Sequence, residues 1–189
     1  FKLLWPDHQS WFGPEGLSAI PIERQRQFCL EVPESHPGWV ADQIFYQIFP
    51  DRFCNGDPAI SVHTGEYQYG DGSHPVIAKQ WHEPVASGHD STGATEFYGG
   101  DLAGIQNRLY YLQSLGITAL YLNPIFVSPS NHKYDTVDFY KVDPHLGSNE
   151  QLAELVSNLH QRSMRLVLDA VVDHTSDQHP WFNKNGMGQ

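Results

Sequence analysis

The residues with the clearest chemical potential lie at the end of a short apolar run, where Asp169, Asp173 and His174 occur within or just after residues 165–171. An apolar run without polar alternation is typical of a strand that is buried on both faces of a parallel sheet. A carboxylate in such a strand is costly to bury unless it is paired, so we expect Asp169 to have a dedicated partner. Because ligands bind at the carboxyl ends of the strands in a parallel α/β barrel, the three side chains should line a pocket. In the alternative interpretation, Asp169 orders a turn, and His174 is a structural residue at the end of the strand whose hydrogen bonds are made within the protein.

A second group of polar and aromatic side chains follows the apolar run 117–123. It includes Tyr134, Asp135 and Asp138, in a loop that extends to residue 147. Taken alone, Tyr134 is more often a packing residue than a ligand-binding one, because aromatic side chains occur mostly in packing roles. The loop is therefore a candidate part of a site only if the fold brings it near Asp169.

The pattern of the sequence predicts the elements that position these side chains: strands at 41–53, 117–123 and 165–171, and helices at 101–116 and 149–162. Strands that alternate with helices indicate right-handed βαβ crossovers and a parallel sheet. The segments after the strands are long and polar, whereas those after the helices are short, as in a barrel that gathers functional groups at one end. The predicted fold is α/β: the N-terminal part of a (β/α)8 TIM barrel, with about three of its strands and two of its helices.

The chain is predicted to divide into three parts. Residues 1–32 contain short candidate strands broken by Pro and Gly and are interpreted as the C-terminal strands of an N-terminal β domain. Residues 33–40 form a turn-rich linker, and residues 41–189 form the first part of the barrel. A complete barrel takes about 250 residues, so we expect a fragment that is truncated after the third strand. The unpaired edges of such a sheet would favour self-association.

The composition excludes several classes of partner. The chain has 189 residues, with 22 Asp and Glu against 11 Lys and Arg and a net charge of −11. Nucleic-acid binding requires a basic stripe, so a neutral ligand fits better. No apolar run approaches the roughly 20 residues that span a bilayer, and no signal-peptide pattern opens the chain. Cys29 and Cys54 form neither a metal motif nor a disulfide framework. We expect a cytoplasmic location.

Five segments together carry a resemblance to a known family: IFYQIFPDRF (44–53), FYGGDLAGI (97–105), ITALYLNPIF (117–126), SPSNHKYDTVDFYKVDPHLG (128–147) and LDAVVDHTSD (168–177). In this order and spacing they resemble the α-amylase superfamily, glycoside hydrolase family 13. The HKYDT segment is similar to the branch of neopullulanases, cyclomaltodextrinases and maltodextrin glucosidases. FKLLWPDHQSWF and KQWHEPV are most similar to bacterial maltodextrin glucosidases.

The resemblance implies roles for individual residues. Tyr134 matches the tyrosine whose ring stacks on the sugar at the cleavage point, and His174 matches the imidazole that hydrogen-bonds a hydroxyl of the same sugar. Asp169 matches an aspartate at the floor of the site that orients its neighbours, and Asp135 is expected to brace the pocket. Asp173 departs from the family pattern, which has asparagine there. An ionised Asp only accepts hydrogen bonds, so its neighbours must rearrange.

A tentative calcium site is also implied, because some relatives bind Ca²⁺ with oxygens from matching places. The candidate ligands are Asn55, Asp57, the carbonyl of Gly99, and Asp101. Ca²⁺ takes six to eight oxygens, and the nearby Ile60 offers no side-chain oxygen where another ligand is expected. In the alternative interpretation, residues 55–57 form a turn and Asp101 is a helix N-cap. No cofactor is expected to be required.

The family implies retaining hydrolysis of α-glucosidic bonds in malto-oligosaccharides by a carboxylate nucleophile and a carboxylic acid/base. Both match positions beyond residue 189, so the fragment is expected to bind sugar weakly and to hydrolyse nothing. The parent enzyme is expected to be this glycosidase. A homodimer of the parent, or self-association of the fragment, is the expected assembly. One alternative is a non-catalytic carbohydrate-binding or transport-associated protein with an amylase-like barrel. A metal-dependent phosphohydrolase, suggested by Asp173, His174 and His179, is the other.

Overall fold

The computed structural model describes residues 2–4, 6–23, 37–70, 72–87, 90 and 92–182. The chain divides into two compact units, Phe1–Ala41 and Asp42–Gln189. The predicted linker lies largely outside the described residues, so a domain boundary at that point stays a prediction. Among the helices of the described residues, none combines the length and the apolar character that a bilayer crossing demands.

The first unit holds a small antiparallel sheet in the order β1-β2-β3. Its strands are β1 (Lys2–Leu4), β2 (Gln9–Gly13) and β3 (Gly16–Ser18). Gly16 has a φ of 104°, a conformation that glycine adopts without steric cost, and it lets β3 turn back on β2. The assignment of this stretch to a longer β domain stays a prediction.

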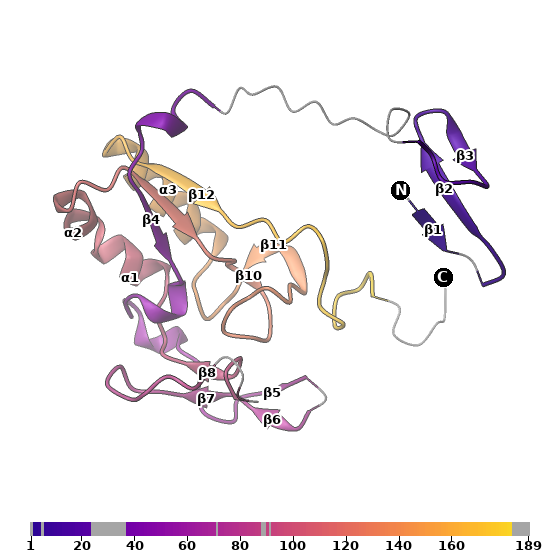
Figure 1. Ribbon diagram of the computed structural model, residues 1–189. Coiled ribbons are helices and arrows are strands. Elements are labelled where there is room, and N and C mark those ends of the chain that lie inside the picture. The colour runs from indigo at the N-terminus through magenta and orange to yellow at the C-terminus, as the bar shows by residue number, and fades with distance from the viewer. Residues whose placement is uncertain are drawn as a thin grey trace. The chain divides into compact units, whose positions relative to one another are not determined.

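The second unit is built on a three-stranded parallel sheet in the order β12-β9-β4 (Figure 1). Its strands are β4 (Phe45–Ile48), β9 (Ala119–Leu122) and β12 (Arg165–Leu168), one within each predicted strand region. Phe45, Ala119 and Arg165 are partners in register, so the carboxyl ends of the three strands lie at one edge of the sheet. The predicted first part of a parallel α/β barrel is confirmed.

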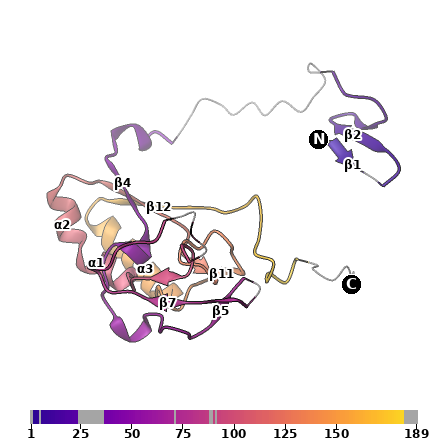
Figure 2. The ribbon, with the colours of Figure 1, turned by 60° about the horizontal axis from the view of Figure 1, so that its bottom comes forward.

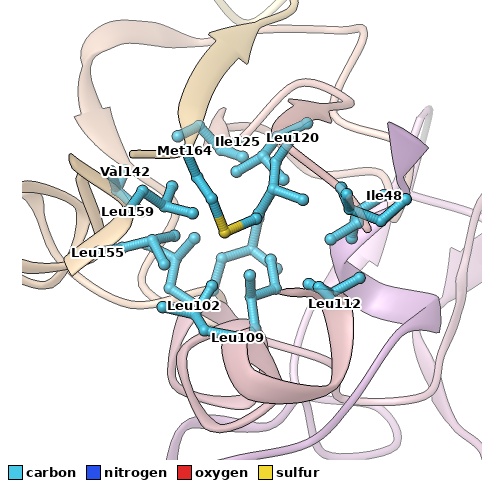
Figure 3. Close-up of a cluster of buried hydrophobic side chains, with 14 residues drawn as sticks. Ile48, Leu102, Leu109, Leu112, Leu120, Ile125, Val142, Leu155, Leu159 and Met164 are labelled. Atoms are coloured by element: carbon cyan, nitrogen blue, oxygen red, sulfur yellow. The ribbon is translucent and has the colours of Figure 1, made fainter. Parts of the chain in front are cut away.

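The helices pack on one face of this sheet. They are α1 (Leu102–Asn107), α2 (Leu109–Ser114) and α3 (Asn149–Gln161). α1 and α3 lie side by side beneath the strands in the view of Figure 2. The 14 buried apolar residues between the helices and the sheet form the main core, which Figure 3 draws as sticks: Ile48, Leu102, Ile105, Leu109, Leu112, Ile117, Leu120, Leu122, Ile125, Val142, Leu146, Leu155, Leu159 and Met164.

The helix ends follow the sequence signals, but one helix is interrupted. Asp101 caps α1 by accepting the Gly104 N–H at 2.6 Å, and Ser148 caps α3 by accepting the Gln151 N–H at 3.2 Å. Gly116 ends the α2 region with a φ of 80°, as expected for a residue just past a helix. The single helix predicted over 101–116 is wrong: Arg108, with φ −102° and ψ 4°, separates α1 from α2.

Burial of the third strand also differs from the prediction. Residues 165–171 were expected to be buried on both faces, whereas β12 is partly exposed and ends at Leu168. The reason is its place in the sheet, because within the described residues β12 pairs only with β9 and therefore forms an edge. Val172, just beyond the predicted run, is 87% exposed.

Two stretches predicted as loops contain short strands. In the segment after β9, β10 (Phe126–Val127) pairs antiparallel with β11 (Asp138–Val142). Residues 54–98 contain two further strand pairs and a small core of Val62, Val76 and Phe97. The pairs are β5 (Gln68–Tyr69) with β6 (His74–Pro75), and β7 (Ile77–Ala78) with β8 (Glu96–Phe97). Single-turn 3-10 helices lie at Val40–Asp42, Pro50–Arg52 and Pro58–Ile60.

Candidate active site

Asp169 lies at the carboxyl end of the sheet and has the partners that its position demands. Its N–H donates to the Leu122 carbonyl at 3.0 Å, which continues the pairing of β12 with β9 by one residue. Its Oδ2 accepts from the Tyr121 hydroxyl at 2.6 Å and from the Tyr134 hydroxyl at 2.9 Å. Two phenols therefore converge on a single carboxylate oxygen. One comes from the neighbouring strand and the other from the loop after it.

Tyr121 is the member of this group that the sequence reasoning missed. Leu120 and Leu122 belong to the core under the helices, so the alternation of a strand turns Tyr121 to the opposite face. A polar-tipped aromatic residue between two core leucines was the available signal, because such a residue usually finds a hydrogen-bond partner on the other face.

The pKa values of both phenols are raised above the ordinary value of tyrosine. The hydrogen bond to Asp169 is the main cause that raises the pKa of Tyr121 to about 12. Burial raises the pKa of Tyr134, and the hydrogen bond to Asp169 raises it further. Each hydroxyl thus remains a donor at neutral pH, and the carboxylate oxygen is held as an acceptor between them.

The backbone next to Tyr134 is fixed by His132. The Tyr134 N–H donates to His132 Nδ1 at 3.1 Å, and the centroids of the two rings are 5.9 Å apart. Burial lowers the pKa of His132, which favours the neutral imidazole that has a nitrogen free to accept. Tyr134 itself remains 36% exposed, so part of its ring is available to a ligand.

A buried ion pair anchors the same loop. Lys133 Nζ lies 2.7 Å from Asp143 Oδ2 and donates to the Ser128 carbonyl at 2.9 Å. The ammonium also lies 5.4 Å from the centroid of the Phe97 ring. Lys133 is 1% exposed and has a φ of 63°, a left-handed conformation that is unfavourable outside glycine. This strain, together with the buried charges, indicates a loop whose conformation is imposed by its surroundings.

Asp135 is hydrogen-bonded within the same loop. Its Oδ1 accepts hydrogen bonds from the hydroxyls of Ser128 and Ser130, and Ser130 Oγ is also 3.1 Å from His132 Nδ1. Asp135 is therefore connected to Tyr134 through Ser130 and His132. Its part in substrate binding stays a prediction.

His174 is not joined to this group. Its Nδ1 lies 2.8 Å from Asp173 Oδ1, and both side chains are largely exposed. Within the described residues, no hydrogen bond connects His174 to Tyr134 or Asp169, and His174 lines a separate hollow with Phe139 and its neighbours. The structure thus brings Tyr134 and Asp169 together, while a contact of His174 with the same sugar stays a prediction.

The residues proposed for calcium do not fit the ion as they are arranged. Both oxygens of Asp101 accept backbone N–H groups, from Gly56, Asp57 and Gly104. Asp57 Oδ1 accepts from Ala59, so it caps a short 3-10 helix.

Asn55 supplies the one feature that favours a ligand. Its Nδ2 donates to Ser61 Oγ at 2.9 Å, and its Oδ1 is buried without a hydrogen-bond partner. Gly99 has a φ of 76° and lies against these side chains. One unpaired oxygen is far from the six to eight that Ca²⁺ takes. In the described part of the chain, no three His, Cys, Asp or Glu side chains gather around a common point.

Several known proteins resemble this chain. The family described as "Alpha amylase, catalytic domain" matches residues 47–188. A cyclomaltodextrinase from Geobacillus thermopakistaniensis is 47% identical over 153 residues, which is 79% of this chain and 23% of the relative. An intracellular maltogenic amylase from Bacillus subtilis is 44% identical over 153 residues, again 79% of this chain and 23% of the relative.

A solved structure shows the same fold. The cyclic α-maltosyl-(1→6)-maltose hydrolase from Arthrobacter globiformis, in complex with that sugar, superimposes with a TM-score of 0.64 at 38% identity. The match covers 77% of this chain and 28% of that protein. This chain thus spans about a quarter of the length of these proteins. The predicted branch of the family is confirmed. The chain belongs to the α-amylase family and represents the beginning of its catalytic (β/α)8 barrel.

Proposed function

We propose that this chain forms the substrate-positioning first part of a retaining glycoside hydrolase that acts on malto-oligosaccharides. The observation that carries the proposal is the hydrogen bond from the Tyr134 hydroxyl to Asp169, at the carboxyl end of the parallel sheet. Ligands of parallel barrels bind at this end. The related hydrolases, one of them described in complex with a cyclic maltosyl sugar, support the substrate class.

Tyr134 and Asp169 would act by orientation. A pyranose has an apolar C–H face that an aromatic ring can cover, and the partly exposed ring of Tyr134 is held in place through its hydroxyl and its backbone N–H. A ring fixed in this way loses little conformational entropy when a sugar binds. Asp169, at the floor of the site, would set the position of both phenols.

The bond-breaking groups are proposed to lie in later strands of the parent enzyme. Retaining hydrolysis needs a nucleophilic carboxylate and an acid/base about 5 Å apart, and their family positions lie beyond residue 189. We therefore expect the 189-residue chain to show no hydrolysis of maltoheptaose above background.

The finer assignments are also proposals. Maltodextrin glucosidase activity is supported by the segments FKLLWPDHQSWF and KQWHEPV, and a cytoplasmic location by the name of the Bacillus subtilis relative. No metal is proposed to be needed. Neither nucleic acid nor a membrane is proposed as a partner, because the chain carries a net charge of −11. Self-association of this chain, or a homodimer of the parent, is proposed from the open edges of the sheet.

Sugar binding to the chain tests the proposal. Maltoheptaose binding would be measured by saturation-transfer NMR, a method suited to millimolar affinity. Tyr134→Ala removes both the ring and the hydrogen bond and should weaken binding about tenfold, whereas Tyr134→Phe keeps the ring and should cost about threefold. Tyr110→Ala is the matched control, because Tyr110 is 81% exposed on α2. Equal binding by wild type, Tyr134→Ala and Tyr110→Ala would contradict the assignment.

A further inference from the structure

The imidazole of His132 holds the backbone of Tyr134 through a single nitrogen atom. Nδ1 accepts the Tyr134 N–H at 3.1 Å, and the same atom lies 3.1 Å from Ser130 Oγ. A neutral imidazole has one bare nitrogen and one N–H, so the proton is on Nε2 when Nδ1 is the acceptor. The nitrogen that remains to take up a second proton is therefore the one that the Tyr134 N–H uses.

Ser130 offers the protonated imidazole a different partner. The Ser130 hydroxyl donates to Asp135 Oδ1, and its oxygen accepts the Lys133 N–H at 3.1 Å. A hydroxyl has one proton and two lone pairs, so one lone pair is left for the imidazole. A proton on His132 Nδ1 would be donated to this oxygen, whereas the Tyr134 N–H would then face another N–H and lose its acceptor. The two hydrogen-bond arrangements exclude each other.

The surroundings of His132 decide which arrangement is present at neutral pH. Burial is the main cause that lowers the pKa of His132; the Asp135 carboxylate raises this pKa, and the Lys133 ammonium lowers it. Lys133 is itself paired with Asp143, and Tyr69 of β5 is hydrogen-bonded to Asp135. The imidazole is therefore neutral at pH 7 and takes up its proton below about pH 6.5, the ordinary pKa of histidine.

The turn from His132 to Tyr134 depends on the contacts that hold it. Lys133, the residue between them, has a φ of 63°, a left-handed conformation that costs free energy outside glycine. At the other end of the Tyr134 side chain, the hydroxyl donates to Asp169. Of these two bonds, only the one to Asp169 remains when the Tyr134 N–H is released. The position of the ring is then less restricted.

We propose that His132 is a positioning residue that makes the placement of Tyr134 sensitive to pH: the neutral imidazole holds the Tyr134 N–H, and the protonated imidazole donates to Ser130 and releases it. Because burial lowers the pKa of His132, the bond to Tyr134 is complete above about pH 6.5 and is lost as the pH falls through the lowered value. The effect on sugar binding rests on the proposed function of Tyr134, whereas the exchange of hydrogen bonds does not.

The exchange of hydrogen bonds can be tested without sugar. The full chain, labelled with ¹⁵N, would be titrated from about pH 7.5 to about pH 4.5, while the Tyr134 amide and the His132 ring are followed by NMR. We expect the amide signal to move upfield with the midpoint of the His132 ring. In His132→Asn, Oδ1 is attached to Cγ as Nδ1 is, accepts the same N–H and does not titrate, so the amide should keep its position. A wild-type amide that does not follow the His132 ring overturns the inference.

Maltoheptaose binding connects this exchange with the site. Binding would be measured by saturation-transfer NMR at one pH above and one pH below the midpoint of the His132 ring. We expect the wild-type chain to bind about threefold more weakly below the midpoint, and His132→Asn to bind equally at both pH values. His160→Asn is the matched control, because His160 is exposed in the last turn of α3 and its variant should keep the wild-type dependence.

The inference and the proposed function fail in different ways. If wild type and His132→Asn show the same pH dependence of maltoheptaose binding, the inference is overturned, and the proposed function stands if Tyr134→Ala still weakens binding. If the Tyr134 amide follows the His132 ring but wild type and Tyr134→Ala bind the sugar equally, the exchange of hydrogen bonds is supported and the proposed function is contradicted.

Discussion

At the scale of single residues, the site depends on how one carboxylate oxygen is shared. Tyr121 and Tyr134 both donate to Asp169 Oδ2, so removal of either phenol leaves the other bond in place. Tyr121 makes the shorter contact, at 2.6 Å, and comes from a strand, whereas Tyr134 comes from a loop. We infer that Tyr121 fixes the carboxylate and that Tyr134 is positioned against it.

Alkaline titration can test the bond from Tyr121. The pKa of Tyr121 is raised to about 12, so this hydrogen bond should stabilise the fold fully below pH 10, the ordinary pKa of tyrosine, and be lost as the pH rises through 12. Tyr121→Phe should therefore remove phenolate absorbance at 295 nm that appears only near pH 12. Absorbance lost in Tyr121→Phe already near pH 10, the ordinary value for tyrosine, would contradict the bond.

The sequence predicted this part of the site incompletely for a physical reason. Because burial of a carboxylate is costly, the sequence correctly predicted that Asp169 has a partner. Nothing within residues 165–174 identifies that partner. Tyr121 lies 48 positions earlier along the chain, on the adjacent strand. Similarly, the sequence predicts that Tyr134 and His174 contact the same sugar, yet of these two residues Tyr134 is the one that bonds to Asp169. The position of each side chain depends on the path of the loop that carries it, which the local sequence does not determine.

At the scale of elements, the loop that carries Tyr134 is anchored from beneath. Lys133 and Asp143 are both almost fully buried, and Asp143 also accepts the N–H groups of Ser128 and His145. The ion pair links the residue before Tyr134 to the end of β11. Its two charges compensate each other in a site that water barely reaches.

Removal of one charge should therefore be costly. Lys133→Met leaves Asp143 buried without its counter-ion and should lower the free energy of unfolding by about 3–5 kcal/mol, measured by urea denaturation. The double variant Lys133→Met with Asp143→Asn should recover part of this loss. Lys141→Met is the control, because Lys141 is exposed and 3.7 Å from Asp138, and it should cost less than about 1 kcal/mol. Equal losses for Lys133 and Lys141 would contradict the role of the buried pair.

Elements with strong periodic signals were predicted well, and those that depend on long-range pairing were not. β4, β9, β12 and α3 lie where apolar runs and caps placed them. The β10–β11 pair was missed, since Phe126 and Val127 form too short a run to indicate a strand without Val142 and Asp138 opposite them. The interruption of the helix at Arg108 has no counterpart in the spacing of the leucines, which continues through it.

At the scale of the whole molecule, the turn at residues 55–57 links the segment after β4 to the start of α1. Its polar side chains resemble the ligands of a cation, but nearly all of them are engaged in hydrogen bonds. Asp101 accepts three backbone N–H groups, and Asn55 reaches Ser61. These contacts bring the segment after β4 to the start of α1. We infer that they perform the stabilising role that a bound cation would otherwise perform.

Calcium should consequently have little effect on the chain. Addition of Ca²⁺ in excess over chelator should leave the melting temperature unchanged within about 1 °C, and equilibrium dialysis should detect no bound ion. Ser61→Asp replaces the hydroxyl that accepts from Asn55 Nδ2 by a carboxylate, and serves as a gain-of-binding control. A rise of several degrees in the wild-type chain would show that these residues rearrange around the ion.

The close approach of α1 to the segment after β4 has a mechanical consequence. A methyl group at Gly104 would lie 1.8 Å from the Cys54 carbonyl oxygen, and one at Gly56 would lie 2.2 Å from the Gly104 backbone nitrogen. The two backbones are therefore in direct contact, with no side chain between them to deform. Any displacement of α1 must therefore carry the segment after β4 with it, so that this turn and the first turn of the helix move as one rigid block.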